Sequence, residues 1–324
     1  MNALEALSHR IADLLRADSR RVMLGEDVRD GGMLGLSRIA ARDDELQARL
    51  LGTPLTNGGL FAHAAGLALG GAMPLIALPS AGALLEAMAK LREIAALSWQ
   101  SGGELATDVI VLAPSGPGFG LGGEASVSPD SMLAELPGVR VVCPSSAAEL
   151  GAMVGAAWNA QADRTLGGPT VILLPRMVLL EEVEEAEVQS ELHGELLEAR
   201  TLAHGSQATV IAWGAAVDVS RRAIAQLGVE VEFLDLRSLS PLDEAALDAA
   251  ARKTGKVVIV HAGARHHGLG AELAARFADT AIWSLDAPIL RVTGARGPFD
   301  AAHEAARLPS VSAVAEAISQ VIYG

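Results

Sequence analysis

Two acidic residues, Glu26 and Asp27, stand where a β-strand is expected to end. They follow the apolar run RVML at 21–24, which predicts a short strand. In open α/β sheets the carboxyl ends of the strands face the ligand crevice, where a carboxylate can bind polar groups or exchange protons. A solvated loop carboxylate is an equally good interpretation, so both roles of Glu26 stay open.

A second polar group occupies a glycine-rich corner within GTPLTNGGLFAHAAGLALGGAMP, residues 52–74. Thr53 precedes a proline, which disfavours the α conformation and predicts an extended entry to the corner. Asn57 and the two glycines after it suit a tight turn and the start of a helix. The helix that follows is rich in small residues, so another backbone or a ligand can approach it closely.

A third candidate is the loop SGPGFGLGGEASVSPDS at 115–131. Its residues Gly118, Gly120 and Gly123 have the G-x-G-x-x-G spacing of dinucleotide-binding proteins. That motif needs a helix immediately afterwards and an acidic residue about 20 positions further on, whereas this loop continues past Ser128. We therefore expect a flexible active-site loop rather than a dinucleotide site.

Metal-ligating residues are not grouped in this sequence. The segment HAGARHHGLGAELAARF at 261–277 carries three histidines, but no carboxylate or cysteine lies at metal-ligand spacing, so surface or interface histidines are expected. Cys143, the single cysteine, lies in the apolar run VRVVCP and cannot form an internal disulfide. A buried, unreactive thiol is the expected outcome.

The composition places these residues in a globular chain with ample core. Of 324 residues, 50% are hydrophobic and 20% are charged. The net charge is −14 and no basic block is present, which disfavours a nucleic-acid or anionic-membrane partner. The amphipathic N-terminus does not resemble a signal peptide, and no apolar run reaches the roughly 18 residues of a membrane span. We expect a soluble cytoplasmic protein.

Apolar strands alternate with helices along the whole chain. Helical spacing of apolar residues predicts helices over Leu4–Ala17 and over about Ala81–Trp99. The alternation predicts parallel sheets covered on both faces, so the fold class is α/β with two doubly wound domains. We expect one domain over 1–180, an acidic connector over 181–198 and a second domain over 199–324.

Six blocks of the sequence resemble, in order, the beta subunit of thiamine-diphosphate-dependent 2-oxoacid dehydrogenases, a branch of the transketolase-like superfamily. They are LGEDV at 24–28, the corner TPLTNGG at 53–59, SGG at 101–103, LPGVRVVCPSS at 136–146, VEFLDLRSLSPLDE at 231–244 and LDAPILRVTG at 285–294. Together the blocks span nearly the whole chain. The resemblance implies a thiamine-pyrimidine-binding-type domain followed by a transketolase C-terminal-type domain.

The same resemblance implies a set of site residues. Asn57 occupies the position of the family's activating glutamate. The implied cofactor-binding positions are Glu26, Leu55, Asn57, Leu84 and Leu85, and the implied substrate-loop positions are Ala125 and Ser126. None of them is expected to bind a metal.

This chain departs from the family where the chemistry lies. In the family, the glutamate hydrogen-bonds a ring nitrogen of the cofactor's aminopyrimidine, and the neighbouring amino group becomes the base that removes the C2 proton. The amide of Asn57 can donate or accept a hydrogen bond but cannot exchange a proton, so we expect a rate loss of roughly 10²–10⁴. The family has an aromatic residue near the start of the long helix, where this chain has only the small residues at 81–83 and Leu84. The family also has a histidine in the loop, at the position that Ala125 occupies here.

Two other side chains near the corner have alternative roles. Glu86 either replaces the missing carboxylate or pairs with Lys90 at i,i+4, and the sequence favours the ion pair. His63 follows the corner on the small-residue helix, where a core histidine is favoured over a catalytic one.

The chain also lacks the Gly-Asp-Gly…Asn pattern that holds Mg²⁺ and the diphosphate, which the alpha subunit supplies in this family. The resemblance therefore implies an alpha-subunit partner in an α2β2 heterotetramer, with self-association of the beta chain and a lipoyl acyltransferase core as a further partner.

The implied function is oxidative decarboxylation of a 2-oxoacid such as pyruvate, with acyl transfer to lipoamide. A catalytically silent paralogue with a structural or regulatory role is the alternative, favoured by Asn57, Ala125 and the missing aromatic. A thiamine enzyme with different ligase or lyase chemistry is a third hypothesis.

Overall fold

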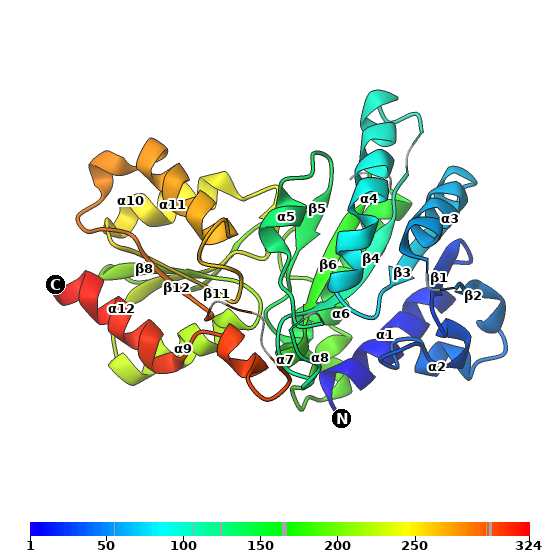
Figure 1. The fold of residues 1–324 in the computed structure, drawn as a ribbon, viewed down its shortest axis with the longest axis horizontal. Helices are drawn as coiled ribbons and strands as arrows, with labels where there is room; N and C mark the ends of the chain where they lie inside the picture. The colour runs from blue at the N-terminus through cyan, green and yellow to red at the C-terminus, as the bar shows by residue number, and fades with distance from the viewer. Residues whose placement is uncertain (55, 106, 124, 164–166, 296, 298–299) are drawn as a thin grey trace.

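The computed structural model describes residues 1–54, 56–105, 107–123, 125–163, 167–295, 297 and 300–324. Leu55, one of the implied cofactor-binding positions, lies outside the described residues. The chain forms two α/β units side by side, each built on its own sheet (Figure 1). In Figure 1 the N-terminal unit runs from blue to green and the C-terminal unit from green to red.

The N-terminal sheet has seven strands in the order β10-β5-β6-β4-β3-β1-β2. In that order they span Ser238–Ser240, Arg140–Val142, Thr170–Pro175, Ile110–Ser115, Met73–Ala77, Arg21–Gly25 and Leu50–Gly52. All neighbours pair in parallel except β10, which is antiparallel to β5. Gly25 at the end of β1 is in register with Gly52 of β2 and Ala77 of β3, so three carboxyl ends meet at one level.

Helices cover both faces of this sheet because successive residues of a strand point to opposite faces. Met23 belongs to the apolar cluster under the N-terminal helix, whereas Leu24 belongs to the cluster on the other face. The first face carries α1 (Ala3–Ala17), α2 (Arg38–Ala41) and α6 (Ala147–Ala162), and the second carries α3 (Asn57–Leu69), α4 (Gly82–Gln100) and α5 (Asp130–Ala134). Short helices α7 (Arg176–Leu179) and α8 (Glu185–Val188) follow β6. The 3-10 turns η1 (Val28–Asp30) and η2 (Gln47–Arg49) lie between β1 and β2.

The C-terminal sheet has five strands in the order β12-β11-β8-β9-β7. In that order they span Leu290–Thr293, Val257–His261, Ala208–Ala212, Val231–Asp235 and Arg200–Ala203. One face carries α9 (Ala216–Leu227) and α12 (Val311–Tyr323), and the other carries α10 (Glu244–Thr254) and α11 (Leu269–Thr280). Residues of α10 and α11 belong to the same apolar cluster as those of α3 and α4, so one core joins the two units. The 3-10 turns η3 (Ile282–Ser284) and η4 (Glu304–Arg307) flank β12.

The predicted fold class, two parallel-sheet α/β domains, is confirmed. Each sheet is mixed rather than purely parallel, because β7 and β10 are antiparallel edge strands. The two long helices predicted from apolar spacing are present as α1 and α4, each within one residue of its expected bounds. In the described part of the chain, none of the helices has the length and apolar character needed to cross a membrane.

Candidate functional site

The carboxyl edge of the N-terminal sheet carries two buried polar atoms with nothing to bond. Glu26 follows β1 and Thr53 follows β2, and the two strands end in register. Glu26 Oε2 and Thr53 Oγ1 are both shielded from solvent, and neither has a hydrogen-bond partner among the described residues. Buried polar atoms are nearly always paired in folded proteins, so two orphans at one edge indicate a site for an added polar group. The sequence pointed to Glu26 but gave no reason to select Thr53.

Asn57 lies at the same corner, as the first residue of α3. Its side chain is 8% exposed, and Nδ2 donates a hydrogen bond of 2.7 Å to Oε2 of Glu86 on α4. The ion pair favoured from the sequence is wrong, because the Lys90 ammonium instead bonds Glu93 one turn further along α4. A carboxylate therefore lies beside Asn57, although it comes from another helix.

The two leucines implied as cofactor contacts have different surroundings. Leu84 is fully buried in the apolar core and offers no surface to a ligand. Leu85 is 39% exposed and lines a cavity of about 390 Å³, together with Met132, His266 and Arg307. This cavity lies between Leu85 of α4 and residues of the C-terminal unit, and its lining includes neither Asn57 nor Glu86.

The glycine-rich loop wraps around a carboxylate from the C-terminal unit. Glu304 in η4 is 5% exposed and accepts five hydrogen bonds. The donors are the backbone N–H groups of Gly118 (2.9 Å), Gly120 (2.6 Å), Leu121 (3.1 Å) and Gly122 (3.2 Å) and the hydroxyl of Ser126 (2.6 Å). Gly120 and Gly122 have φ of +66° and +84°, a left-handed conformation that turns successive N–H groups inward to form an anion nest.

This arrangement determines both the charge of Glu304 and the contacts of the loop. Burial raises the pKa of the Glu304 carboxyl, but the hydrogen bonds from Ser126 and the loop N–H groups outweigh it and lower the pKa to about 2. On the other side, buried Arg176 donates to the carbonyl oxygens of Gly116 and Ala125. Ionic groups of both units therefore contact the loop, and its expected flexibility stays a prediction. Ser126 is fully buried against Glu304, and Ala125 is half-buried.

The histidines and the cysteine belong to no metal-ligating group in the part of the chain that the structure describes. His261 is fully buried and stacks on Trp213 at 4.7 Å, so the expected surface position is wrong for this residue. Burial, with a smaller contribution from Arg291, lowers the pKa of His261 to about 4. Cys143 is buried, as expected, and burial raises the pKa of its thiol. Within the described ranges no group of three or more His, Cys, Asp or Glu side chains is placed to hold a metal ion.

His63 on α3 is exposed, so the expected core position is wrong as well. The apolar face of α3 is carried by Leu60, Phe61 and Ala64, and position 63 lies on the other side of the helix. His63 is therefore on the open side of α3 rather than in the packed core.

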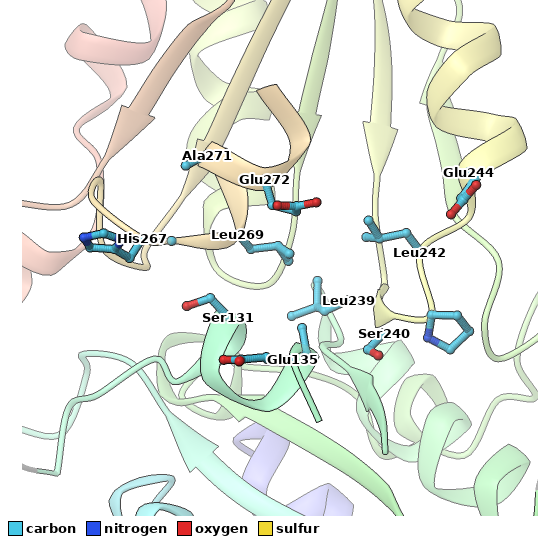
Figure 2. Close-up of a pocket in the computed structure, with 13 residues that line it drawn as sticks. Ser131, Glu135, Leu239, Ser240, Leu242, Glu244, His267, Leu269, Ala271 and Glu272 are labelled. Carbon is cyan, nitrogen blue, oxygen red and sulfur yellow. The ribbon is translucent and has the colours of Figure 1, made fainter. Parts of the chain in front are cut away.

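A larger cavity, of about 740 Å³, lies elsewhere between the units (Figure 2). Figure 2 shows Ser131 and Glu135 on one side and Leu269 and Glu272 of α11 on the other. Its lining includes neither Asn57 nor Glu86, and three of its six polar side chains are carboxylates. Size alone therefore does not mark the site, whereas the orphaned polar atoms at the strand ends do.

Comparison with known protein families divides the chain in two. Residues 1–180 match the transketolase pyrimidine binding domain, and residues 197–314 match the transketolase C-terminal domain. A mitochondrial 2-oxoisovalerate dehydrogenase subunit beta from Dictyostelium discoideum is 30% identical over 305 residues, which is 92% of this chain and 80% of that protein. A pyruvate dehydrogenase E1 component subunit beta from Bacillus subtilis is 28% identical over 329 residues, covering 99% and 98%.

Solved structures share the fold at lower identity. A split-gene transketolase, described as an inactive beta4 tetramer, superposes with a TM-score of 0.78 and 22% identity over 99% of this chain and 98% of that one. Transketolase from Leishmania mexicana superposes with a TM-score of 0.70 and 15% identity over 99% of this chain and 45% of that one. These two likenesses concern the fold alone.

Proposed function

Because the chain belongs to the family of 2-oxoacid dehydrogenase beta subunits, built from the transketolase pyrimidine-binding and C-terminal domains, we propose that it completes a thiamine diphosphate site with an alpha subunit. The reaction would be oxidative decarboxylation of a 2-oxoacid such as pyruvate, followed by acyl transfer to lipoamide. The observation that supports this best is the open corner at the carboxyl edge of the sheet. There, orphaned Glu26 Oε2 and Thr53 Oγ1 accompany the Asn57–Glu86 contact.

The residues at the corner fit an aminopyrimidine ring. Such a ring carries both an amino group that donates and ring nitrogens that accept, and carboxylate, hydroxyl and amide groups match that pattern. Glu26 and Thr53 would hold the ring by the oxygens that lack partners among the described residues, and Leu85 would contact its edge. Thiamine diphosphate, when bound, would supply nucleophilic carbon chemistry toward the keto group of the substrate.

The rest of the cofactor would be held outside this chain. The described residues contain no cluster suited to a divalent ion, and the sequence lacks the Gly-Asp-Gly…Asn pattern. An alpha subunit would therefore hold Mg²⁺ and the diphosphate, in a heterotetramer of two alpha and two beta chains. Self-association of the beta chain and docking to a lipoyl acyltransferase core belong to the same proposal.

The test is cofactor-dependent decarboxylation of pyruvate and branched 2-oxoacids by this chain co-purified with its alpha partner. We expect turnover by the complex with added thiamine diphosphate and Mg²⁺, and none by this chain alone. Light scattering on the same preparation reports whether the assembly contains two copies of each chain. A stable complex that turns over only after Asn57→Glu would support the silent paralogue and overturn the catalytic role.

A further inference from the structure

The Asn57–Glu86 contact joins a side chain that cannot exchange protons to one that can. Asn57 begins α3, and Glu86 lies in the second turn of α4, which packs directly against α3. The 2.7 Å bond from Asn57 Nδ2 fixes one carboxylate oxygen of Glu86 at the start of α3. Among titratable side chains a carboxyl exchanges protons readily, whereas an amide at ordinary pH does not.

Glu86 is not committed to another partner in the described part of the chain. Lys90, the nearest cation along α4, bonds Glu93. Glu86 itself is exposed, and its only hydrogen bond among the described residues comes from Asn57. A carboxylate can accept about four hydrogen bonds, so most of this capacity remains available to a group bound at the corner.

The start of α4 leaves room for this carboxylate. Ala81, Gly82 and Ala83 have no side-chain atoms beyond Cβ, so no bulky group stands at the beginning of the helix. The two departures noted in the sequence, an amide at position 57 and small residues before Leu84, then have one explanation. On that explanation, the carboxyl of the site is carried by α4 instead of α3.

We propose that Glu86 supplies the proton-exchanging carboxyl of this site and that Asn57 is its positioning residue. This inference rests on the proposed function, because the group that Glu86 serves is the aminopyrimidine ring of thiamine diphosphate. The exchange would be balanced within the pair: Glu86 would hold a shared proton between its carboxyl oxygen and a ring nitrogen, and Asn57 would orient that oxygen. No other reactant is consumed.

The experiment compares Glu86→Gln with the matched control Glu93→Gln in the complex with the alpha partner. Two quantities are measured with thiamine diphosphate: the number of protons taken up or released on binding, from calorimetry in two buffers of different ionisation enthalpy, and the rate of C2 proton exchange in D₂O by NMR. We expect Glu86→Gln to remove the proton uptake and to slow exchange roughly 10²–10⁴-fold. Glu93→Gln, on the same helix, leaves both unchanged.

Four further variants test where the carboxyl must be and whether Asn57 positions it. Asn57→Glu alone would place two carboxylates in contact, so each would disfavour ionisation of the other. Asn57→Glu combined with Glu86→Gln returns a single carboxyl to the corner and is expected to restore exchange. Asn57→Ala is expected to shift the pH profile of C2 proton exchange relative to wild type. Asn57→Gln, which keeps the amide, is expected to have a profile close to that of wild type.

The outcomes separate this inference from the proposed function. A wild-type complex that binds no thiamine diphosphate overturns both. A complex that binds the cofactor, and in which Glu86→Gln exchanges as fast as wild type, overturns the role of Glu86 and leaves the proposed function standing. A wild-type complex that binds the cofactor but shows no C2 proton exchange also overturns the role of Glu86, because the Glu86 carboxyl is present in that complex and should have supported exchange.

Discussion

Glu304 and Glu86 are both carboxylates that join segments distant in the sequence, yet their surroundings differ. Glu304 is almost fully buried and accepts five hydrogen bonds from the glycine-rich loop. Glu86 is exposed and accepts one, from Asn57, in the described part of the chain. The buried Oε2 of Glu26 is like Glu86 in one respect, since its hydrogen-bonding capacity is not satisfied by the described residues.

The difference in hydrogen bonding distinguishes a carboxylate that stabilises the fold from polar groups that are available to a ligand. The nest around Glu304 is complete, because the chain itself supplies every donor that the carboxylate needs. The corner around Asn57 is incomplete, because among the described residues the buried polar atoms there have no partner and an exposed carboxylate is held at one oxygen only. Polar groups that a protein leaves unsatisfied are candidates for binding something else, so the incomplete region is where a ligand belongs.

The largest expected effect on the free energy of unfolding comes from a substitution in the nest around Glu304. Glu304→Gln should lower the free energy of unfolding by about 3 kcal/mol, the equivalent of moving the pKa from 4.5 to about 2. The amide cannot carry the charge, and its nitrogen would face backbone N–H groups. Denaturant unfolding followed by tryptophan fluorescence measures the change.

Glu182→Gln is the matched control for Glu304→Gln. Glu182 is largely exposed, and its ion-pair partner among the described residues is the N-terminal ammonium at 3.7 Å, so its replacement should change the free energy of unfolding by less than about 0.5 kcal/mol. If Glu304→Gln unfolded at the same denaturant concentration as this control, the nest would contribute nothing to stability and the contrast between the two regions would be lost.

The pH dependence of stability refines the same comparison. Because the folded-state pKa of Glu304 is depressed to about 2, its contribution is fully present above pH 4.5 and is lost as the pH falls towards 2. The difference in unfolding free energy between wild type and Glu304→Gln should therefore be constant near neutral pH and shrink below pH 4.5. Denaturation curves at several pH values measure it, and a difference that grew on acidification would contradict the assigned charge.

Much of the fold could be predicted because its signals are local. The apolar runs that became β4, β6, β8 and β11 are buried along their whole length, and such runs with helices between them indicate parallel sheets. The corner was also predictable, because Thr53 before a proline and Asn57 before two glycines specify a strand exit and a helix start. The antiparallel pairing of β10 with β5 was not, because a three-residue edge strand carries little pattern.

The contacts of the site could not be read from the sequence because they are tertiary. The i,i+4 rule favoured Glu86 with Lys90, but α3 brings Asn57 to Glu86, and Lys90 bonds Glu93 instead. Glu304 is separated by 178 residues from Ser126, and no periodicity links the two. The glycine-rich loop suggested that something would be bound there, but the ligand is the chain's own carboxylate.

The smallest expected effect is Glu86→Gln on the stability of the full chain without its partner. Glutamine keeps an oxygen that can accept the bond from Asn57, and the position is exposed, so the free energy of unfolding should change by less than about 0.5 kcal/mol. The same denaturation experiment measures it. A loss close to that of Glu304→Gln would mean that Glu86 is a structural carboxylate already satisfied within the chain. A near-zero change, set against a large loss of proton exchange in the complex, is the combination that a group reserved for a ligand should give.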